Sequence, residues 1–270
     1  MSEEHAINQS DLPTTTESLR SDLRQFGVEP GMTLLVHSSL SSLGWVCGGA
    51  RAVVDALIAA VDDVGTLVMP AHSAELSDPV YWQNPPVPTN WWPTIRDSTP
   101  AFDPQRTSTR AMVAIPELFR TYPNVLRSRH PQVSFAAFGP NADTITSNHE
   151  YDFALGEGSP LARIYELDGS VLLLGVGFDN NTSLHLSEYR VEPRIAKPIK
   201  NGAPIMAEGE RKWLELNDIE TTSHDFTKIG EAFAKRAESY QSSQVSCARV
   251  QLMSQREVVD FGQSWMQKHR

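Results

Sequence analysis

The chain has few cysteines: only Cys47 and Cys247 occur among its 270 residues, and they lie far apart. Two distant cysteines match no metal-binding or redox motif, and they cannot build the disulfide framework that is typical of small secreted proteins. We therefore expect a protein of the reducing cytoplasm.

Long apolar runs are absent as well. No stretch approaches the length that crosses a membrane. The first ten residues, MSEEHAINQS, are acidic and polar, whereas a signal peptide has a basic start and an apolar centre. The sequence thus predicts a soluble, cytoplasmic protein with no membrane partner.

An excess of positive charge is the third absence. The chain has 23 Lys and Arg against 33 Asp and Glu, a net charge of −10. Such a chain repels phosphate backbones, so we expect no nucleic-acid partner, whereas a cationic substrate is compatible with this charge. The length is enough to bury a sizeable core. We expect one domain over residues 1–270, with residues 1–13 as a flexible arm.

Apolar patterning predicts strands that alternate with helices. Strands are expected at residues 32–37, 66–69, 133–138 and 171–176, with an antiparallel pair at 203–207 and 210–216. After a first capped helix that begins near residues 14–17, helices are expected at 48–61, 112–122, 142–147, 161–167, 226–239 and 256–268. This order indicates an α/β protein.

Residues 71–108 break the pattern, because they are rich in Pro, Trp and Asp and lack periodicity. Long irregular stretches in compact domains are usually functional or disordered. Four aromatic residues argue for order, since disordered segments are poor in aromatics: Tyr81, Trp82, Trp91 and Trp92. We expect an ordered loop that packs over a site.

The most informative segment is LLLGVGFDNNTSLHLSEYR, which begins at Leu172. A buried strand is followed by a polar turn, and Thr182 or Ser183 can cap a helix there. That helix would carry His185 in its first turn and Glu188 one turn further along the same face. Polar side chains at the carboxyl end of a buried strand are typical of α/β active sites, although a capped helix with a solvated histidine would give the same pattern.

A second polar segment, His37 to Gly44, follows the first predicted strand and precedes a helix. Small hydroxyl residues and glycine expose backbone N–H groups there, as anion sites require. The spacing is neither a Walker loop nor a dinucleotide fingerprint. A serine-rich turn with a helix cap is the structural alternative.

Four segments occur in an order that resembles the aminoglycoside 3-N-acetyltransferase family: HSSLSSLGWVCGG, FDPQRTSTRAM, RSRHPQVSFAAFG and LGEGSPLARIYELDGSVLLLGVGFDNNTSLHLSEYR. The likeness runs from about Val36 to Arg190, with weaker agreement from His224 to Phe233. It implies an α/β fold, a three-layer α/β/α sandwich with a central mixed sheet and a small additional C-terminal β segment. It also implies acetyl-CoA as co-substrate, no metal, and a cationic amine as acceptor. A homodimer stays possible.

The resemblance also implies roles for particular residues. His185 matches the functional histidine of the family. CoA would lie along the serine loop and against two threonines: His37, Ser38, Ser39, Leu40, Ser41, Thr107 and Thr109. Asp179, Glu157 and Glu188 would face the acceptor, which in the family is the 3-amino group of 2-deoxystreptamine aminoglycosides. Glu157 could equally be a solvated turn residue in LGEGSP, and Thr107 and Thr109 could cap the following helix.

The chemistry of acetyl transfer requires a base, because an ammonium group has no lone pair with which to attack a thioester. A neutral imidazole suits that task. We therefore expect His185 to be the general base in a direct transfer, with Glu188 or Asp179 as the carboxylate that orients it. The sequence does not separate these two carboxylates.

Other functions remain open on the sequence alone. The acceptor could be a different amine metabolite. A hydrolase that uses a serine, His185 and an acid would normally show a G-x-S-x-G elbow, and the GEGSP segment does not fit it. A metal hydrolase could gather His37, His72, His130 and His185, but no pair has the H-E-x-x-H spacing. A binding protein without catalytic activity is the third alternative.

Overall fold

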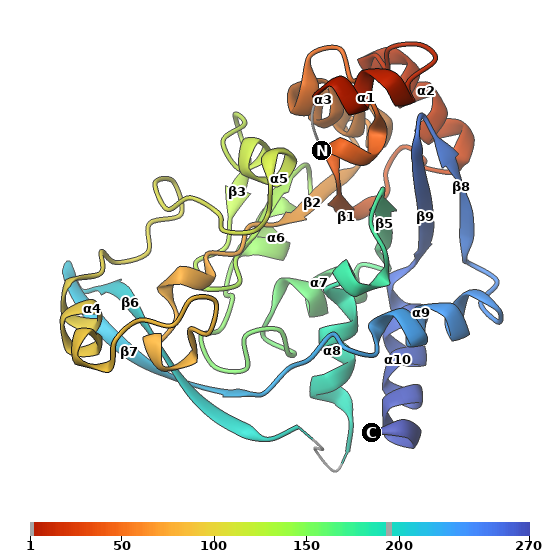
Figure 1. Ribbon diagram of the computed structural model, residues 1–270. Coiled ribbons are helices and arrows are strands. Elements are labelled where there is room, and N and C mark those ends of the chain that lie inside the picture. The colour runs from red at the N-terminus through yellow and green to blue at the C-terminus, as the bar shows by residue number, and fades with distance from the viewer. Residues whose placement is uncertain (1–2, 193–195) are drawn as a thin grey trace.

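A seven-stranded mixed sheet, in the order β3-β4-β2-β1-β5-β9-β8, forms the centre of the protein in the computed structural model, which describes residues 3–192 and 196–270 (Figure 1). Its strands are β1 (Thr33–Ser38), β2 (Thr66–Pro70), β3 (Leu126–Arg127), β4 (Phe135–Phe138), β5 (Ser170–Leu174), β8 (Gln241–Val245) and β9 (Ala248–Ser254). β1 pairs in parallel with both β2 and β5, while β4 and β9 run antiparallel to their partners. The carboxyl ends of β1, β2 and β5 therefore meet at one edge.

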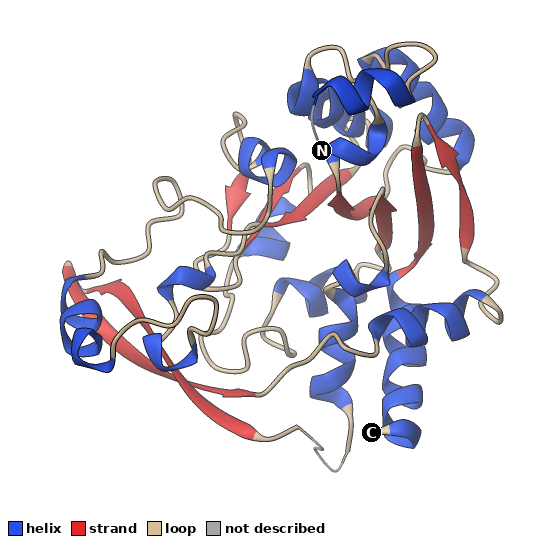
Figure 2. Cartoon of the chain, viewed as in Figure 1, coloured by secondary structure: helices blue, strands red, loops and turns tan. Residues whose placement is uncertain are grey.

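Helices cover both faces of this sheet, which confirms the expected three-layer α/β/α architecture (Figure 2). One face carries α2 (Thr16–Phe26), α3 (Gly49–Val61) and α5 (Ala114–Phe119). The other carries α6 (Ala142–Thr146), α7 (Pro160–Glu166), α8 (Ser183–Arg190), α9 (Phe226–Ala234) and α10 (Gln255–His269). No helix in these described ranges is long and apolar enough to span a membrane.

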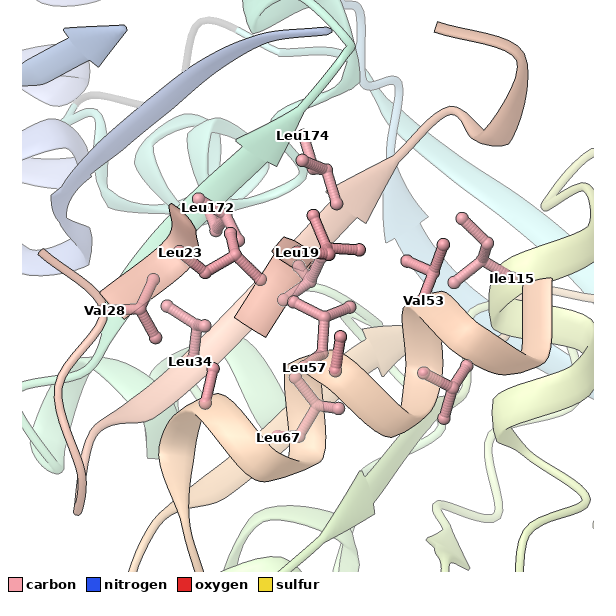
Figure 3. Packing of buried hydrophobic residues seen from close by; sticks show 14 of the residues in the cluster. Leu19, Leu23, Val28, Leu34, Val53, Leu57, Leu67, Ile115, Leu172 and Leu174 are labelled. Carbon is pink, nitrogen blue, oxygen red and sulfur yellow. The ribbon is translucent and has the colours of Figure 1, made fainter. Parts of the chain in front are cut away.

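Strand β5 shows why the central strands are continuous apolar runs. Leu172 and Leu174 point into the core with α2 and α3, whereas Val171 and Leu173 point into the core with α7 to α10. Successive side chains of a strand alternate between faces, so a strand covered on both sides needs apolar residues at every position. Figure 3 shows the first of these cores, with Leu172 and Leu174 of β5 among residues of α2 and α3 that include Leu19, Leu23, Val53 and Leu57.

A long hairpin stands apart from the main sheet. β6 (Pro198–Ala207) pairs antiparallel with β7 (Glu210–Ile219), which confirms and extends the predicted pair. The loop of residues 71–108 packs on it through the short helix α4 (Trp92–Ser98), which lies beside the hairpin in Figure 1. The hydroxyl of Tyr81 donates to the Lys200 carbonyl at 2.7 Å, and Nε of Arg211 donates to the Thr99 carbonyl at 2.8 Å. The aromatic loop is therefore ordered, as expected, by the hairpin.

Several elements differ from the sequence prediction. Strands β3, β8 and β9 and helix α4 were not predicted, and the exposed edge strand β8 reads QSSQV, which has no apolar alternation. Helix α1 (Glu3–Gln9) forms where an irregular arm was expected. Ser10, which follows α1, accepts a hydrogen bond from the backbone N–H of Trp45 at 2.8 Å and so ties this segment to the serine loop.

Close packing between α9 and the turn before α8 provides a test of the fold. A Cβ added at Gly230 would overlap the ring of Phe178, which lies in the 3-10 helix η5 (Phe178–Asn180). Alanine favours helices over glycine by about 1 kcal/mol, yet overpacking typically costs about 1–3 kcal/mol. We expect Gly230→Ala to lower the free energy of unfolding in urea, while Thr227→Ala at an exposed position of the same helix leaves it nearly unchanged. A stabilised Gly230→Ala would contradict this packing.

Candidate active site

A histidine–glutamate pair lies on helix α8. His185 and Glu188 are three residues apart and therefore share one face, and Nδ1 of His185 lies 2.6 Å from Oε2 of Glu188. The Glu188 side chain is fully buried, whereas that of His185 is 18% exposed. Because a carboxylate can only accept, the Nδ1 proton faces Glu188 and the Nε2 lone pair is left free. This is the geometry of an oriented base.

The Glu188 carboxylate is satisfied at both oxygens. Oε1 accepts from the backbone N–H of Thr222 at 3.0 Å and from Nη1 of Arg270 at 2.5 Å. Arg270 in turn makes two hydrogen bonds to the carboxylate of Asp225, at 2.8 Å and 2.6 Å. Arg270 and Asp225 were not predicted as site residues, because nothing in their spacing indicates that they approach α8.

The two carboxylates that the sequence left open are now distinguished. Asp179 lies on η5 and is exposed, and it makes no hydrogen bond to His185 in the part of the chain that the structure describes. Glu188 makes that bond. The expectation of Asp179 as an orienting carboxylate is therefore not supported by the geometry, and its expected contact with the acceptor stays a prediction.

Helix α8 begins where the sequence predicted, but a different side chain caps it. Neither Thr182 nor Ser183 supplies a capping oxygen; Oδ1 of Asn181 accepts from the backbone N–H of Ser183 at 3.1 Å. The Thr182 hydroxyl lies 3.3 Å from Nε2 of His37 instead. The turn after β5 thereby contacts the end of β1.

Two more histidines lie near His185 at the edge where β1 and β2 end. Burial, together with the proximity of His185, lowers the pKa of His37 to about 3 and that of His72 to about 3. Nε2 of His72 is buried and has no hydrogen-bond partner among the described residues. His72 was expected only as a possible metal ligand, and no group of three or more His, Cys, Asp or Glu within the described ranges could hold a metal ion.

The serine loop, residues 37–44, is hydrogen-bonded to the end of β5. Ser39 donates its backbone N–H to the Leu174 carbonyl at 2.9 Å, and the Ser42 hydroxyl donates to the Gly175 carbonyl at 2.9 Å. Gly175 has a φ of 72°, and a Cβ there would lie 2.6 Å from that of Ser42, so only glycine allows this approach. The Ser38 hydroxyl is buried and has no hydrogen-bond partner in the part of the chain that the structure describes.

A cavity of about 430 Å³ opens beside this loop. Its lining includes Ser39, Leu40, Ser41, Trp45, Val113 and Ala114. The two threonines that were expected opposite the loop do not line it. Thr107 lines a separate cavity of about 800 Å³, and the backbone N–H of Thr109 donates to Glu117 at 2.7 Å. Neither threonine caps the following helix, because the N-cap of α5 is Val113. The structure brings the serine loop to the site and leaves the threonines in a local cluster.

Glu157 is an exposed turn residue whose charge is already paired. Nε of Arg190 lies 2.6 Å from its carboxylate, and this hydrogen bond lowers the pKa of Glu157 below its usual value. Its contact with the acceptor stays a prediction. In that contact the acceptor and Arg190 would both bind the Glu157 carboxylate.

The histidine of the RSRHP segment has a structural environment. Nδ1 of His130 accepts from the backbone N–H groups of Gln132 and Val133 at 3.2 and 3.1 Å. Its ring lies 4.8 Å from that of His149. Burial lowers the pKa of His130 to about 4 and that of His149 to about 3. These two histidines stabilise a turn of the backbone.

Comparisons with known proteins bear on the site. Residues 35–267 match the family described as aminoglycoside 3-N-acetyltransferase. The chain is 46% identical over 260 residues to the SPbeta prophage-derived aminoglycoside N(3')-acetyltransferase-like protein YokD of Bacillus subtilis (strain 168), with 96% of this chain and 94% of the relative covered. The crystal structure of YokD matches with a TM-score of 0.95 at 45% identity, covering 98% of this chain and 97% of that chain.

Two further solved structures are similar and name ligands in their descriptions. AAC-IIIb, described as binary with CoASH, is 28% identical with a TM-score of 0.85, over 95% of this chain and 97% of that chain. AAC-VIa, described as bound to sisomicin, is 30% identical with a TM-score of 0.85, over 94% of this chain and 98% of that chain.

The buried histidines predict how stability depends on pH. His37, His130 and His149 have lowered pKa values in the fold, whereas imidazole in an unfolded chain titrates near about 6.5. Below that pH the unfolded state binds protons that the folded state does not, so stability is full above about pH 6.5 and falls as the pH drops towards 4. At pH 5 each histidine should account for a loss of at most about 2 kcal/mol.

Urea unfolding at pH 7.5 and pH 5.0 measures this loss. His149→Gln should reduce the difference between the two pH values, whereas His269→Gln, at an exposed position, should not. An unchanged pH dependence in His149→Gln would contradict the assignment.

Proposed function

Because the chain belongs to the aminoglycoside 3-N-acetyltransferase family, we propose that it transfers the acetyl group of acetyl-CoA to the 3-amino group of a 2-deoxystreptamine aminoglycoside. The 2.6 Å contact between Nδ1 of His185 and Glu188 is the observation that carries this proposal. Similar proteins described with CoASH and with sisomicin support the two substrates.

His185 acts as the general base in this mechanism. Its Nε2 takes one proton from the ammonium form of the acceptor, and the amine nitrogen then attacks the thioester carbonyl. As the C–S bond breaks, the second N–H proton passes to the CoA sulfur, which leaves as the thiol, and His185 later returns its proton to solvent. Glu188 holds the tautomer and stabilises the imidazolium that forms. General-base assistance of this kind contributes about 10² to 10⁴ in rate, and alignment of the two substrates supplies much of the rest. No covalent acyl-enzyme is required.

The serine loop binds the donor in this proposal. His37 and Ser38 end β1, and Ser39, Leu40 and Ser41, which follow them, border the cavity of about 430 Å³. The unpartnered Ser38 hydroxyl offers a hydrogen bond to a ligand, because buried polar groups are rarely left unsatisfied. His37, with its pKa lowered to about 3, remains neutral and adds no charge there.

The acceptor is recognised through negative charge. The chain carries a net charge of −10, and exposed Asp179 lies on the turn that leads into α8. A polycationic aminoglycoside approaching such a surface is attracted over about 8 Å at physiological ionic strength. Glu157, paired with Arg190, contributes less free charge.

The alternative functions make different demands on the site. A serine hydrolase needs a serine hydroxyl at Nε2 of His185, and no such hydrogen bond occurs within residues 3–192 and 196–270.

Release of CoA thiol from acetyl-CoA in the presence of an aminoglycoside, with mass analysis of the acetylated product, tests the proposal. Acetylation of other amines but not of aminoglycosides would show that the acceptor is a different amine. Ester hydrolysis without acetyl transfer would refute the proposal.

Substitution of the base tests the mechanism. His185→Ala should lower kcat by about 10² or more with little change in the Kd for CoA, because a base acts on the transition state and not on donor binding. Glu188→Gln should also lower kcat, since it weakens the orientation of His185. Asp179→Asn should leave kcat nearly unchanged and raise the KM of the acceptor. A His185→Ala variant with normal turnover would refute the role of His185.

Substitution in the serine loop tests the donor site. Ser39→Leu places a bulky side chain at the cavity, so the Kd for CoA measured by calorimetry should rise about tenfold, by loss of roughly 1.4 kcal/mol of binding energy. Ser243→Leu, on the exposed face of edge strand β8, is the control and should bind CoA normally. Unchanged CoA binding in a folded Ser39→Leu protein would show that the loop only caps the helix.

A further inference from the structure

We propose that Arg270 is a positioning residue of the active site, whose guanidinium keeps the buried Glu188 carboxylate ionised and fixed against His185. This inference rests on the proposed role of His185 as the base. It assigns a function to a residue that lies 85 positions along the chain from that histidine and directly follows helix α10.

The contacts of Arg270 engage its whole guanidinium group. Nη1 lies 2.5 Å from Oε1 of Glu188, and Nη2 donates to the Thr222 carbonyl at 3.1 Å. Nε and Nη2 bind the two oxygens of Asp225 at 2.8 and 2.6 Å. A bidentate pair of this kind fixes both the position and the plane of the guanidinium. Asp225 therefore fixes the orientation of the Arg270 side chain, and Arg270 fixes that of the Glu188 carboxylate.

The two carboxylate oxygens of Glu188 have different hydrogen-bond partners. Oε2 faces His185, while Oε1 faces Arg270 and the Thr222 N–H. The side chain has no exposure to solvent, so water cannot stabilise its charge. A buried carboxylate without a compensating cation takes up a proton instead. Arg270 is the cation in contact with Glu188 among the described residues, and its removal leaves only the backbone N–H at that oxygen.

The other groups around the pair do not replace this charge. His37 and His72 face His185, and their lowered pKa values, near 3, keep them neutral. His224 makes a short hydrogen bond to the Thr222 hydroxyl. The further acidic neighbours are Asp225 and, through the hydroxyl of Tyr189, Asp218. Burial alone would lower the pKa of Arg270, but the hydrogen bonds to Asp225 and Glu188 outweigh it and raise that pKa.

The consequence is a specific effect on proton uptake. His185 and Glu188 are in direct contact, so they bind an added proton as one unit. A nearby positive charge opposes that proton, and its removal makes the pair easier to protonate, whichever of the two groups holds the proton. Without Arg270 the active, unprotonated form should therefore be lost at a higher pH.

The rate profile of Arg270→Met tests this effect. In the plot of kcat/KM for the acceptor against pH, the acid limb should shift to higher pH by about one unit. The loss of kcat/KM relative to the wild type should then be about tenfold larger at acidic pH than on the alkaline plateau. Arg270→Lys, which keeps the charge but not the bidentate geometry, should restore most of the limb position. Arg256→Met is the control: it removes an arginine from α10 that lies 3.5 Å from Asp168 at the surface, and its profile should match the wild type.

A second measurement does not depend on activity. The imidazole signals of His185, followed by NMR in the free protein over the same pH range, should titrate at a higher pH in Arg270→Met than in the wild type. An equal loss of rate at every pH, with unchanged imidazole signals, would show that Arg270 is only structural and would refute the proposal. A wild type that acetylates no amine would refute the proposed function, and the NMR titration would still decide whether Arg270 controls the pair.

Discussion

A single buried carboxylate constrains the architecture of this site. Glu188 has no contact with solvent, so every hydrogen bond that its charge requires must come from the protein. His185 supplies one from the same helix, the Thr222 N–H supplies another, and Arg270 supplies the third from beyond α10. These partners come from three segments, and they can meet only when α8, α9 and α10 pack on one face of the sheet. The proposed base, His185, is therefore oriented by tertiary structure and not by its helix alone.

The topology of the sheet explains why the segments that we propose for the donor and the acceptor meet. β1, β2 and β5 are parallel neighbours, and their carboxyl ends deliver the serine loop, His72 and the turn before α8 to one edge. The hydrogen bond from Ser42 to the Gly175 carbonyl then connects the serine loop after β1 to the turn after β5. Because a side chain at Gly175 would overlap Ser42, the approach depends on that glycine.

The sequence predicted the parts of the site that depend on local patterns. Continuous apolar runs identified β1 and β5, and the three-residue spacing of His185 and Glu188 placed them on one face of a helix. The choice between Glu188 and Asp179 could not be made, because it depends on which carboxylate is buried. Arg270 and Asp225 were missed for the same reason: their role arises from packing between distant segments. Edge strand β8 was missed because exposed strands need no apolar pattern.

The charges that remain at the site suit the chemistry that we propose. His37 and His72 are kept neutral by burial, so the ionised groups in direct contact are Glu188, Asp225 and Arg270. Two carboxylates and one guanidinium leave one net negative charge, which is balanced when His185 takes a proton. An uncompensated carboxylate nearby would favour a bound proton, whereas a second cation would oppose it. One arginine between two acids places the site between these limits, and this balance favours a base that both accepts and returns a proton in each turnover.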